Sequence, residues 1–199
     1  MSYAMTRLQI DKPRRSAYIG RVKYRRLILS VALIPALFAQ DKPIEVLAPY
    51  YETPEPVVER MLQLGNLRAG EKMADLGSGD GRIVIRAAIK YKADATGVEY
   101  DRALVKQSEK RISRLKLSNS AHIIEGDLLR QDYSSFDLLT VYLLPVANEK
   151  LIPLLEKQLK PGARVVSHNT PLAPWTPVKV DDIPNDGEGH SHKLYLYVR

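Results

Sequence analysis

The stretch Met73-Ala-Asp-Leu-Gly-Ser-Gly-Asp-Gly-Arg82 decides the fold of this 199-residue chain. It joins a short apolar run to a glycine-rich turn, and a helical pattern follows the turn. In open α/β sheets, ligands bind beyond the carboxyl ends of the strands, and the turn after the first strand comes close to them. Gly77, Gly79 and Gly81 let the backbone turn sharply and approach a ligand, because glycine has no Cβ. The sequence therefore predicts a ligand-binding turn here.

The chemistry of this turn favours a cationic ligand over a phosphate. A P-loop requires a Gly-Lys-Ser/Thr ending, which is absent. The dinucleotide fingerprint requires a third glycine at the position where Arg82 stands. Asp75 and Asp80 flank the turn and would repel a pyrophosphate. S-adenosylmethionine (SAM) carries a sulfonium and an ammonium group, so we expect SAM as the cofactor.

Short apolar runs alternate with helical patterns over most of the chain. This alternation is typical of parallel strands joined by right-handed helical crossovers. The last two strands are separated only by a polar loop, so we expect them to pair as an antiparallel hairpin at the sheet edge. The predicted strands are 73–76, 95–99, 122–125, 138–143, 164–168, 178–182 and 193–198.

The predicted helices complete a single α/β domain over residues 41–199. Thr53 is expected to cap the first helix, with Pro54 at its first position. The other helices are expected over 82–91, 102–117 and 147–159, with a short connection at 128–135. The fold class is therefore a Rossmann-like sheet of seven strands, parallel except at its end, with helices on both faces.

Acidic residues follow the second and third strands, as they follow the first. Glu99 ends the second strand, where a carboxylate can accept hydrogen bonds from both ribose hydroxyls of a nucleoside. Asp127 follows the third strand and can accept from an adenine amine, and the backbone of Leu128 can meet the ring. Three acids at neighbouring strand ends, in this order, are typical of a SAM site; ordinary turn glycines and surface acids are the alternative.

These motifs resemble those of the class I SAM-dependent methyltransferases. Within that class, the chain is similar to the small archaeal protein-lysine methyltransferases and their mitochondrial relatives, which modify lysines of ATP synthase and of the adenine nucleotide translocase. The resemblance covers about 49–198. It rests on Pro49-Tyr50, Thr53-Pro54, Val57-Val58, Asp75–Ile83, Gly97-Val-Glu99, Leu143-Leu144, Asn148-Glu149, Leu159–Gly162, Arg164–His168, Trp175, His192 and Leu194–Val198.

The resemblance implies methylation of a lysine side chain on a protein substrate by in-line methyl transfer. It also implies that Tyr50 and Thr53 help to close the SAM pocket. Tyr142, near the end of the fourth strand, is either part of a lysine channel or a packed strand aromatic. Asn148 is a further candidate nearby. His168 ends the fifth strand, where it either relays a proton or orients a carbonyl, or is a buried structural histidine.

Other site chemistries are disfavoured by the residues present. The chain has no Cys, which excludes disulfides, thiolate nucleophiles and Cys-ligated zinc. Asp186, Glu188, His190 and His192 lie on a polar loop with no further fixed ligand nearby, so a solvated turn is favoured over a metal site. We therefore predict no metal. A methyltransferase for a small molecule or lipid, and a non-catalytic binding module with this fold, stay open as alternatives.

The basic charge of the chain belongs to its N-terminal segment. Residues 1–26 hold eight of the 30 Lys and Arg and one of the 23 Asp and Glu, so the rest of the chain has no net charge. Nucleic acid is therefore not expected as a partner. Uncharged residues 27–39 follow, too few to span a bilayer. We predict that residues 1–40 are a targeting or anchoring segment, with membrane association through 21–39 or export, and a cytoplasmic location as the alternative.

Overall fold

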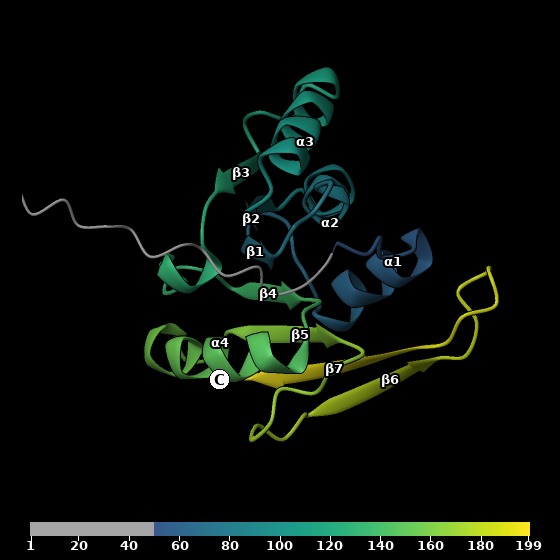
Figure 1. The fold of residues 1–199 in the computed structure, drawn as a ribbon, viewed down its shortest axis with the longest axis vertical. Helices are drawn as coiled ribbons and strands as arrows, with labels where there is room; N and C mark the ends of the chain where they lie inside the picture. Colours follow the sequence, from purple (N-terminus) through teal and green to yellow (C-terminus); the bar gives the residue numbers. More distant parts are fainter. Residues whose placement is uncertain (1–49) are drawn as a thin grey trace, which may run out of the picture. The chain divides into compact units, whose positions relative to one another are not determined.

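The computed structural model describes residues 50–199, so the predicted targeting or anchoring segment lies outside the described residues. Seven strands of the described part form one sheet (Figure 1). The strands are β1 (Lys72–Leu76), β2 (Asp94–Glu99), β3 (Ala121–Glu125), β4 (Leu138–Val141), β5 (Arg164–His168), β6 (Lys179–Ile183) and β7 (His192–Val198).

The sheet has the order β3-β2-β1-β4-β5-β7-β6, and the first five strands are parallel. Strand β7 runs antiparallel to both of its neighbours, β5 and β6. The chain forms one half of the sheet from β1 outward to β3, and then returns to the centre to form the other half, beginning with β4. The order therefore reverses between β1 and β4, and a crevice is expected there beyond the carboxyl ends of the strands. The predicted fold and the terminal hairpin are confirmed.

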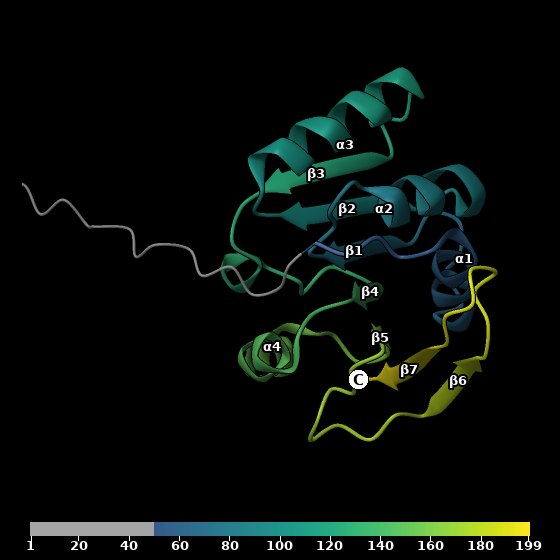
Figure 2. The ribbon, with the colours of Figure 1, turned by 45° about the vertical axis from the view of Figure 1, so that its right-hand side comes forward.

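Helices cover both faces of the sheet (Figure 2). Helices α1, α2 and α3 pack on one face, and α4 with the short helix η2 packs on the other. Strand β1 contributes to the core on both faces, since Met73 packs with the helices of the first face and Ala74 with those of the second. The helices are α1 (Glu55–Leu64), α2 (Arg82–Arg86), η1 (Ala87–Tyr91, a π-helix), α3 (Arg102–Arg114), η2 (Leu128–Arg130, a 3-10 helix) and α4 (Pro145–Gln158). Among residues 50–199, no helix is both long enough and apolar enough to cross a membrane.

Several predicted boundaries need correction. The cap of α1 is Pro54 and not Thr53, because the Pro54 backbone is extended and its carbonyl accepts the first helical bonds, from Val57 and Val58. The fourth strand ends at Val141, two residues before the predicted end. The helix after the glycine turn changes to a π-helix at Ala87. These differences shift ends of elements and leave their order unchanged.

Candidate active site

A cavity of about 240 Å³ lies at the carboxyl edge of the sheet, at the ends of β1, β2, β3 and β4. Eight of the nine residues predicted to bind the cofactor line it. These are Tyr50, Thr53, Asp75, Gly77, Gly79, Glu99, Asp127 and Leu128. The cavity walls also hold Asp80 and Asp101, and one guanidinium, that of Arg82. Within residues 50–199, five carboxyl groups and one cation line the cavity, and this balance favours a positively charged ligand.

The glycine turn forms the floor of this cavity. Gly77 and Gly79 have φ values of +80° and +53°, which L side chains rarely adopt. The backbone N–H groups of Gly77 and Ser78 both donate to the carbonyl of Val98 on β2. A Cβ at Gly79 would lie 2.4 Å from Cε2 of Tyr50. The turn is thus anchored to β2, and the missing Cβ of Gly79 leaves room for the Tyr50 ring to pack directly against the backbone.

The third glycine of the turn has a different role. Gly81 caps α2 with φ +75°, and it does not line the cavity. A Cβ at this position would lie 3.0 Å from Cβ and Oγ of Ser108 on α3. The Ser108 hydroxyl also donates to the carbonyl of Gly79 at 3.0 Å. The structure therefore places Gly81 against a helix, and the ligand contact expected for it remains without support.

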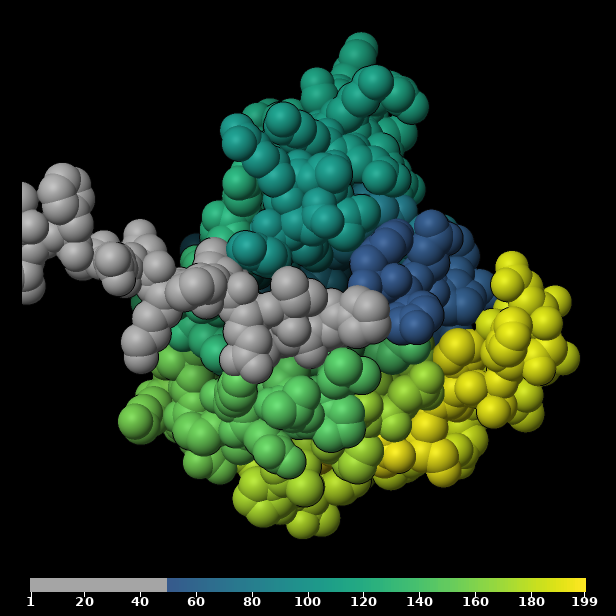
Figure 3. Space-filling model, in the orientation of Figure 1, coloured from purple at the N-terminus to yellow at the C-terminus, as the bar shows by residue number. Residues whose placement is uncertain are grey.

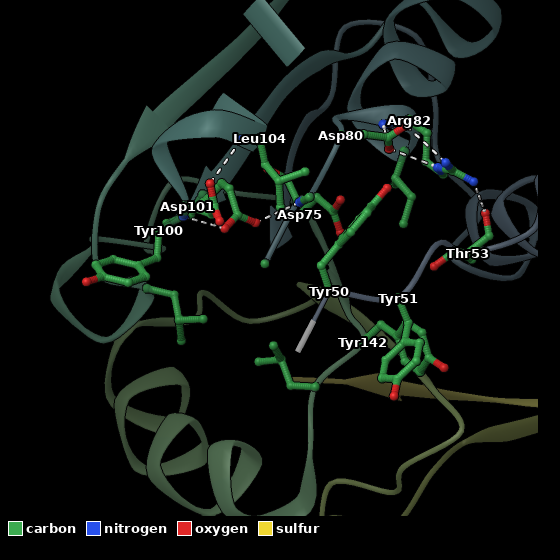
Figure 4. A pocket seen from close by; sticks show the side chains of 18 of the residues that line it. Tyr50, Tyr51, Thr53, Asp75, Asp80, Arg82, Tyr100, Asp101, Leu104 and Tyr142 are labelled. Atoms are coloured by element: carbon green, nitrogen blue, oxygen red, sulfur yellow. Dashed lines mark hydrogen bonds and ion pairs between the residues drawn. The ribbon is translucent and has the colours of Figure 1, made fainter. Parts of the chain in front are cut away.

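Glu99 holds the cavity wall together through its two carboxylate oxygens. Oε2 accepts from the backbone N–H of Gly79 at 2.8 Å, and Oε1 accepts from the N–H of Asp101 at 2.7 Å. Asp101 in turn caps α3, because its Oδ1 accepts from Ala103 and Leu104 (Figure 4). A carboxylate has about four acceptor sites, so Glu99 retains two for a ligand.

Asp75 is a buried carboxylate at the end of β1. Its Oδ1 accepts a 2.6 Å hydrogen bond from the Thr140 hydroxyl of β4. Burial raises the pKa of Asp75 to about 7; the Thr140 bond lowers it, and the charges of Glu99 and Asp80 add to the increase. Asp75 therefore changes charge near neutral pH, and a cation in the cavity would favour its ionised form.

Asp80 is held in a cluster of charged groups. Its carboxylate accepts from Nε and Nη2 of Arg82 at 2.9 and 3.0 Å and contacts Nη1 of Arg111 on α3. Burial alone would raise the pKa of Asp80, but the hydrogen bonds and charges of these guanidinium groups bring it below its ordinary value. Arg82 also donates to the carbonyl of Thr53 at 2.9 Å. The cluster ties the segment before α1 to the glycine turn (Figure 4).

Asp127 is engaged by its own segment. Oδ1 accepts from the N–H of Leu129 at 2.8 Å and caps η2, and Oδ2 lies 3.5 Å from Arg130. The residue lines the cavity beside Gly126 and Leu128. Three acids from three neighbouring strand ends therefore share one cavity, as the sequence pattern predicts.

The three catalytic candidates lie at different depths. Tyr142 lines the cavity, whereas Asn148 and His168 do not. The His168 ring is fully buried and packs on the Tyr142 ring, with centroids 3.9 Å apart. Asn148 is buried in α4, and neither atom of its amide group has a hydrogen-bond partner within residues 50–199. Only Tyr142 is thus placed to touch a substrate.

Sequence reasoning missed several residues of the cavity. Tyr51, Tyr100, Asp101 and Leu104 line it without having been predicted. Asp101 had a readable signal, since it follows a strand-ending acid and precedes a helix, as an N-cap does. Tyr51 and Tyr100 gave no such signal, because an aromatic in a loop does not reveal what it faces.

The family model described as "ANTKMT methyltransferase domain" matches residues 75–179. The chain belongs to this methyltransferase family. A protein-lysine N-methyltransferase of Saccharolobus islandicus is 40% identical over 75% of this chain and 92% of its own length. Two mouse relatives, lysine N-methyltransferases of an ATP synthase subunit and of the adenine nucleotide translocase, are 31% and 36% identical. The chain spans 60% and 68% of these two, and each match covers about three quarters of this chain.

A solved structure also supports the assignment of this chain to the methyltransferases. It is described as an RNA methyltransferase from Salinibacter ruber in complex with S-adenosyl-L-homocysteine. It is 40% identical, covers 74% of this chain and 93% of its own, and has a TM-score of 0.69. The family model, the relatives and this structure all support a methyltransferase, and the name of this structure differs from those of the relatives in the macromolecule that is methylated.

Proposed function

We propose that this methyltransferase domain transfers a methyl group from SAM to lysine side chains of a protein. The observation that carries the proposal is the convergence of Asp75, Glu99 and Asp127 on one cavity. These side chains come from the ends of β1, β2 and β3, so only the folded sheet brings them together. A site with this excess of carboxylates suits the two cationic groups of SAM and disfavours phosphate ligands.

The residues present fit SAM by their donor and acceptor chemistry. Glu99 would accept hydrogen bonds from the ribose hydroxyls, and Asp127 would accept from the adenine amine. Asp75 is the buried acid that would face the cationic end of the ligand, and its pKa of about 7 leaves it ready to ionise there. Tyr50 lies directly over Gly79 and would cover the bound ligand.

When bound, SAM supplies a methyl group already activated by its sulfonium. The protein's part is to align an amine with that group and to exclude water, and such positioning contributes several kcal/mol. A lysine ammonium has a pKa of ~10.4, so it must lose a proton before it can attack. Tyr142 lines the cavity and offers a ring face and a hydroxyl to the incoming amine.

The curated relatives support a protein substrate, since those named above are protein-lysine N-methyltransferases. The neutral charge of the chain after residue 26 supports it further, because RNA enzymes present basic surfaces. RNA is the second candidate substrate, on the single observation that the Salinibacter ruber structure is described as an RNA methyltransferase.

One labelling experiment separates these substrates. The full chain is incubated with SAM carrying a labelled methyl group and a cell extract, and label is measured in protein, RNA and solvent-extractable fractions. We expect label in protein, and mass spectrometry should assign it to lysine. Label confined to RNA or to small molecules would refute the lysine assignment. The Glu99→Gln variant should bind SAM more weakly, because it weakens the bonds to Gly79 and Asp101.

We also propose that the enzyme associates with a membrane through residues 21–39. The support is the basic block before residue 27 and the uncharged run 27–39. SAM must then be present on the side that the domain occupies. Membrane fractionation with protease protection tests this, and a full-length protein found only in the soluble fraction would refute it.

A further inference from the structure

A hydrogen-bonded chain of three side chains, those of Asp186, His192 and His168, leads from the terminal hairpin to the ring of Tyr142. His192 Nε2 lies 3.0 Å from Oδ2 of Asp186, and His192 Nδ1 lies 2.9 Å from Nε2 of His168. The His168 ring then packs on Tyr142, which lines the cavity. The residues come from β5, from β7 and from the loop that joins β6 to β7. This hairpin lies beside α1 at the surface of the domain (Figure 3), where Arg60 of α1 binds Asp181 of β6.

The carboxylate at one end gives the chain a direction. Oδ1 of Asp186 accepts from the backbone N–H groups of Glu188 and His190, so only Oδ2 faces His192. A carboxylate can only accept, so His192 Nε2 must carry a proton. In neutral His192 the Nδ1 atom is then a lone pair, and it must accept from Nε2–H of His168. The remaining nitrogen of His168, Nδ1, is therefore left as a basic lone pair.

That lone pair is the open end of the chain. His168 is fully buried, and within residues 50–199 its Nδ1 has no hydrogen-bond partner. A buried acceptor without a partner costs about 1–3 kcal/mol, so a structural role alone does not explain it. It is an unpaired basic nitrogen on a ring that packs on Tyr142, the one catalytic candidate lining the cavity, and a proton acceptor needs such a free lone pair.

The charges around the chain determine where a proton would rest. Hydrogen bonds from His192 and from the loop backbone hold the pKa of Asp186 well below its usual range, so it is a carboxylate. Burial, together with the neighbouring His192, lowers the pKa of His168 to about 3. His168 therefore passes a proton on and does not keep it. A proton that His168 passes on would reach His192, which lies beside the Asp186 carboxylate.

The other charged groups nearby are the exposed His190, 3.6 Å from Asp186, the exposed Glu188, which has a carboxylate oxygen within 4.8 Å of both, and two ion pairs. These pairs are Arg60 with Asp181 and Lys193 with Asp182. Each pair is internally neutralised, so neither competes for the proton. The hydrogen-bonded chain thus has one charged end, at Asp186, and one unpaired end, at Nδ1 of His168, whose ring packs on Tyr142.

We propose that Asp186, His192 and His168 form a relay that removes the proton from the substrate amine. The N–H bond of the ammonium breaks, and a proton is delivered to Nδ1 of His168. At the same time Nε2–H of His168 passes its proton to Nδ1 of His192. The positive charge moves from the amine to a His192 imidazolium paired with Asp186, and the amine keeps its electron pair for attack on the methyl group. Because His168 does not line the cavity and its Nδ1 is buried without a partner, the first transfer requires the Tyr142 ring, which packs on His168, to shift so that its hydroxyl or a water reaches Nδ1.

This proposal rests on the proposed function, since it assigns the base for an amine substrate. The relay would separate two positive charges that otherwise share the cavity, the ammonium and the sulfonium. Asp186 and His192 are then positioning residues, because they act through His168. Substituting either residue must therefore change which ring nitrogens of the histidines carry protons, as well as the rate of methyl transfer.

The test is the Asp186→Asn variant of the full chain. The backbone N–H groups of Glu188 and His190 select the carboxamide oxygen, so the new NH₂ group faces His192. His192 Nε2 must then accept, and the direction of both hydrogen bonds in the chain reverses. Nitrogen-15 NMR of the histidine side chains should show His168 protonated at Nε2 in the wild type and at Nδ1 in the variant.

The rate of the variant should depend on pH in a diagnostic way. At pH 7 we expect kcat to fall about 100-fold, at the lower end of the ~10²–10⁴ contributed by general acid–base groups. The loss should shrink as the pH rises towards the ordinary lysine pKa of ~10.4, where the amine is already neutral in solution. SAM affinity should not change. The control is Asp182→Asn, which breaks the exposed pair with Lys193 on the same hairpin and should leave rate and tautomers unchanged.

Three results would overturn the relay. The first is a loss of rate in Asp186→Asn that is equal at every pH, which indicates a structural role. The second is no loss at all. The third is a neutral His168 protonated at Nδ1 in the wild type. This measurement needs no variant, so it tests the relay even if Asp186→Asn does not fold. If the wild type labels no protein lysine, the proposed function itself fails. The NMR result is independent of that outcome, because it tests only the direction of the hydrogen bonds.

Discussion

Asp75 makes the affinity for SAM depend on pH near neutrality. Its pKa is about 7 because the carboxylate is buried, and within residues 50–199 the Thr140 hydroxyl alone stabilises its ionised form. A cation binds the carboxylate and not the neutral acid, so binding requires the loss of a proton. The apparent Kd should therefore be about twofold above its limiting value at pH 7 and about tenfold above it at pH 6, or ~1.4 kcal/mol per pH unit below 7.

Isothermal titration calorimetry of SAM binding, in two buffers of different ionisation enthalpy, measures both quantities. About half a proton should be released per SAM bound at pH 7, and close to one at pH 6. Thr140→Val should move the loss of affinity to higher pH, because the bond that lowers the pKa of Asp75 is removed. Asp75→Asn should bind weakly at every pH and release no proton. A wild-type affinity that is constant from pH 6 to 8.5 would refute the reasoning.

Two further predictions test the glycine turn and the charged cluster. Gly79→Ala should lower SAM affinity by about tenfold or more, because its Cβ would overlap the ring of Tyr50; Gly70→Ala, which has φ +79° and no atom within 4 Å of its Cβ, is the control for backbone strain alone. An equal loss of SAM affinity in both variants would assign the effect to strain. Asp80→Asn should reduce the free energy of unfolding by about 3 kcal/mol in urea, because it removes the charge that pairs with Arg111. Since the pKa of Asp80 is lowered in the folded state, its contribution is present above the ordinary aspartate pKa and is lost as the pH falls, so wild type and variant should converge in acid.

Much of the fold could be predicted from local pattern. The alternation of apolar runs with helical periodicity specifies parallel strands and their handedness, since both follow from chirality and burial. The acids at 75, 99 and 127 could be placed at one edge because parallel strands end on the same side. The boundaries at Thr53 and Val141 could not, because Pro54 took the cap position and the pairing of the fourth strand with β5 stops at Val141.

The sequence by itself determined the succession of strands and helices along the chain, the glycine turn and the presence of three strand-end acids, because these depend on periodicity and on backbone conformation. Only the tertiary structure decided which partner each polar group meets. Gly81 packs against α3, Asp75 is buried beside Thr140, and residues 168, 186 and 192 form one hydrogen-bonded chain. The physical reason is that burial and long-range contacts set charge and tautomer, and the pairing of β5 with β7 brings His168 to His192 across 24 residues.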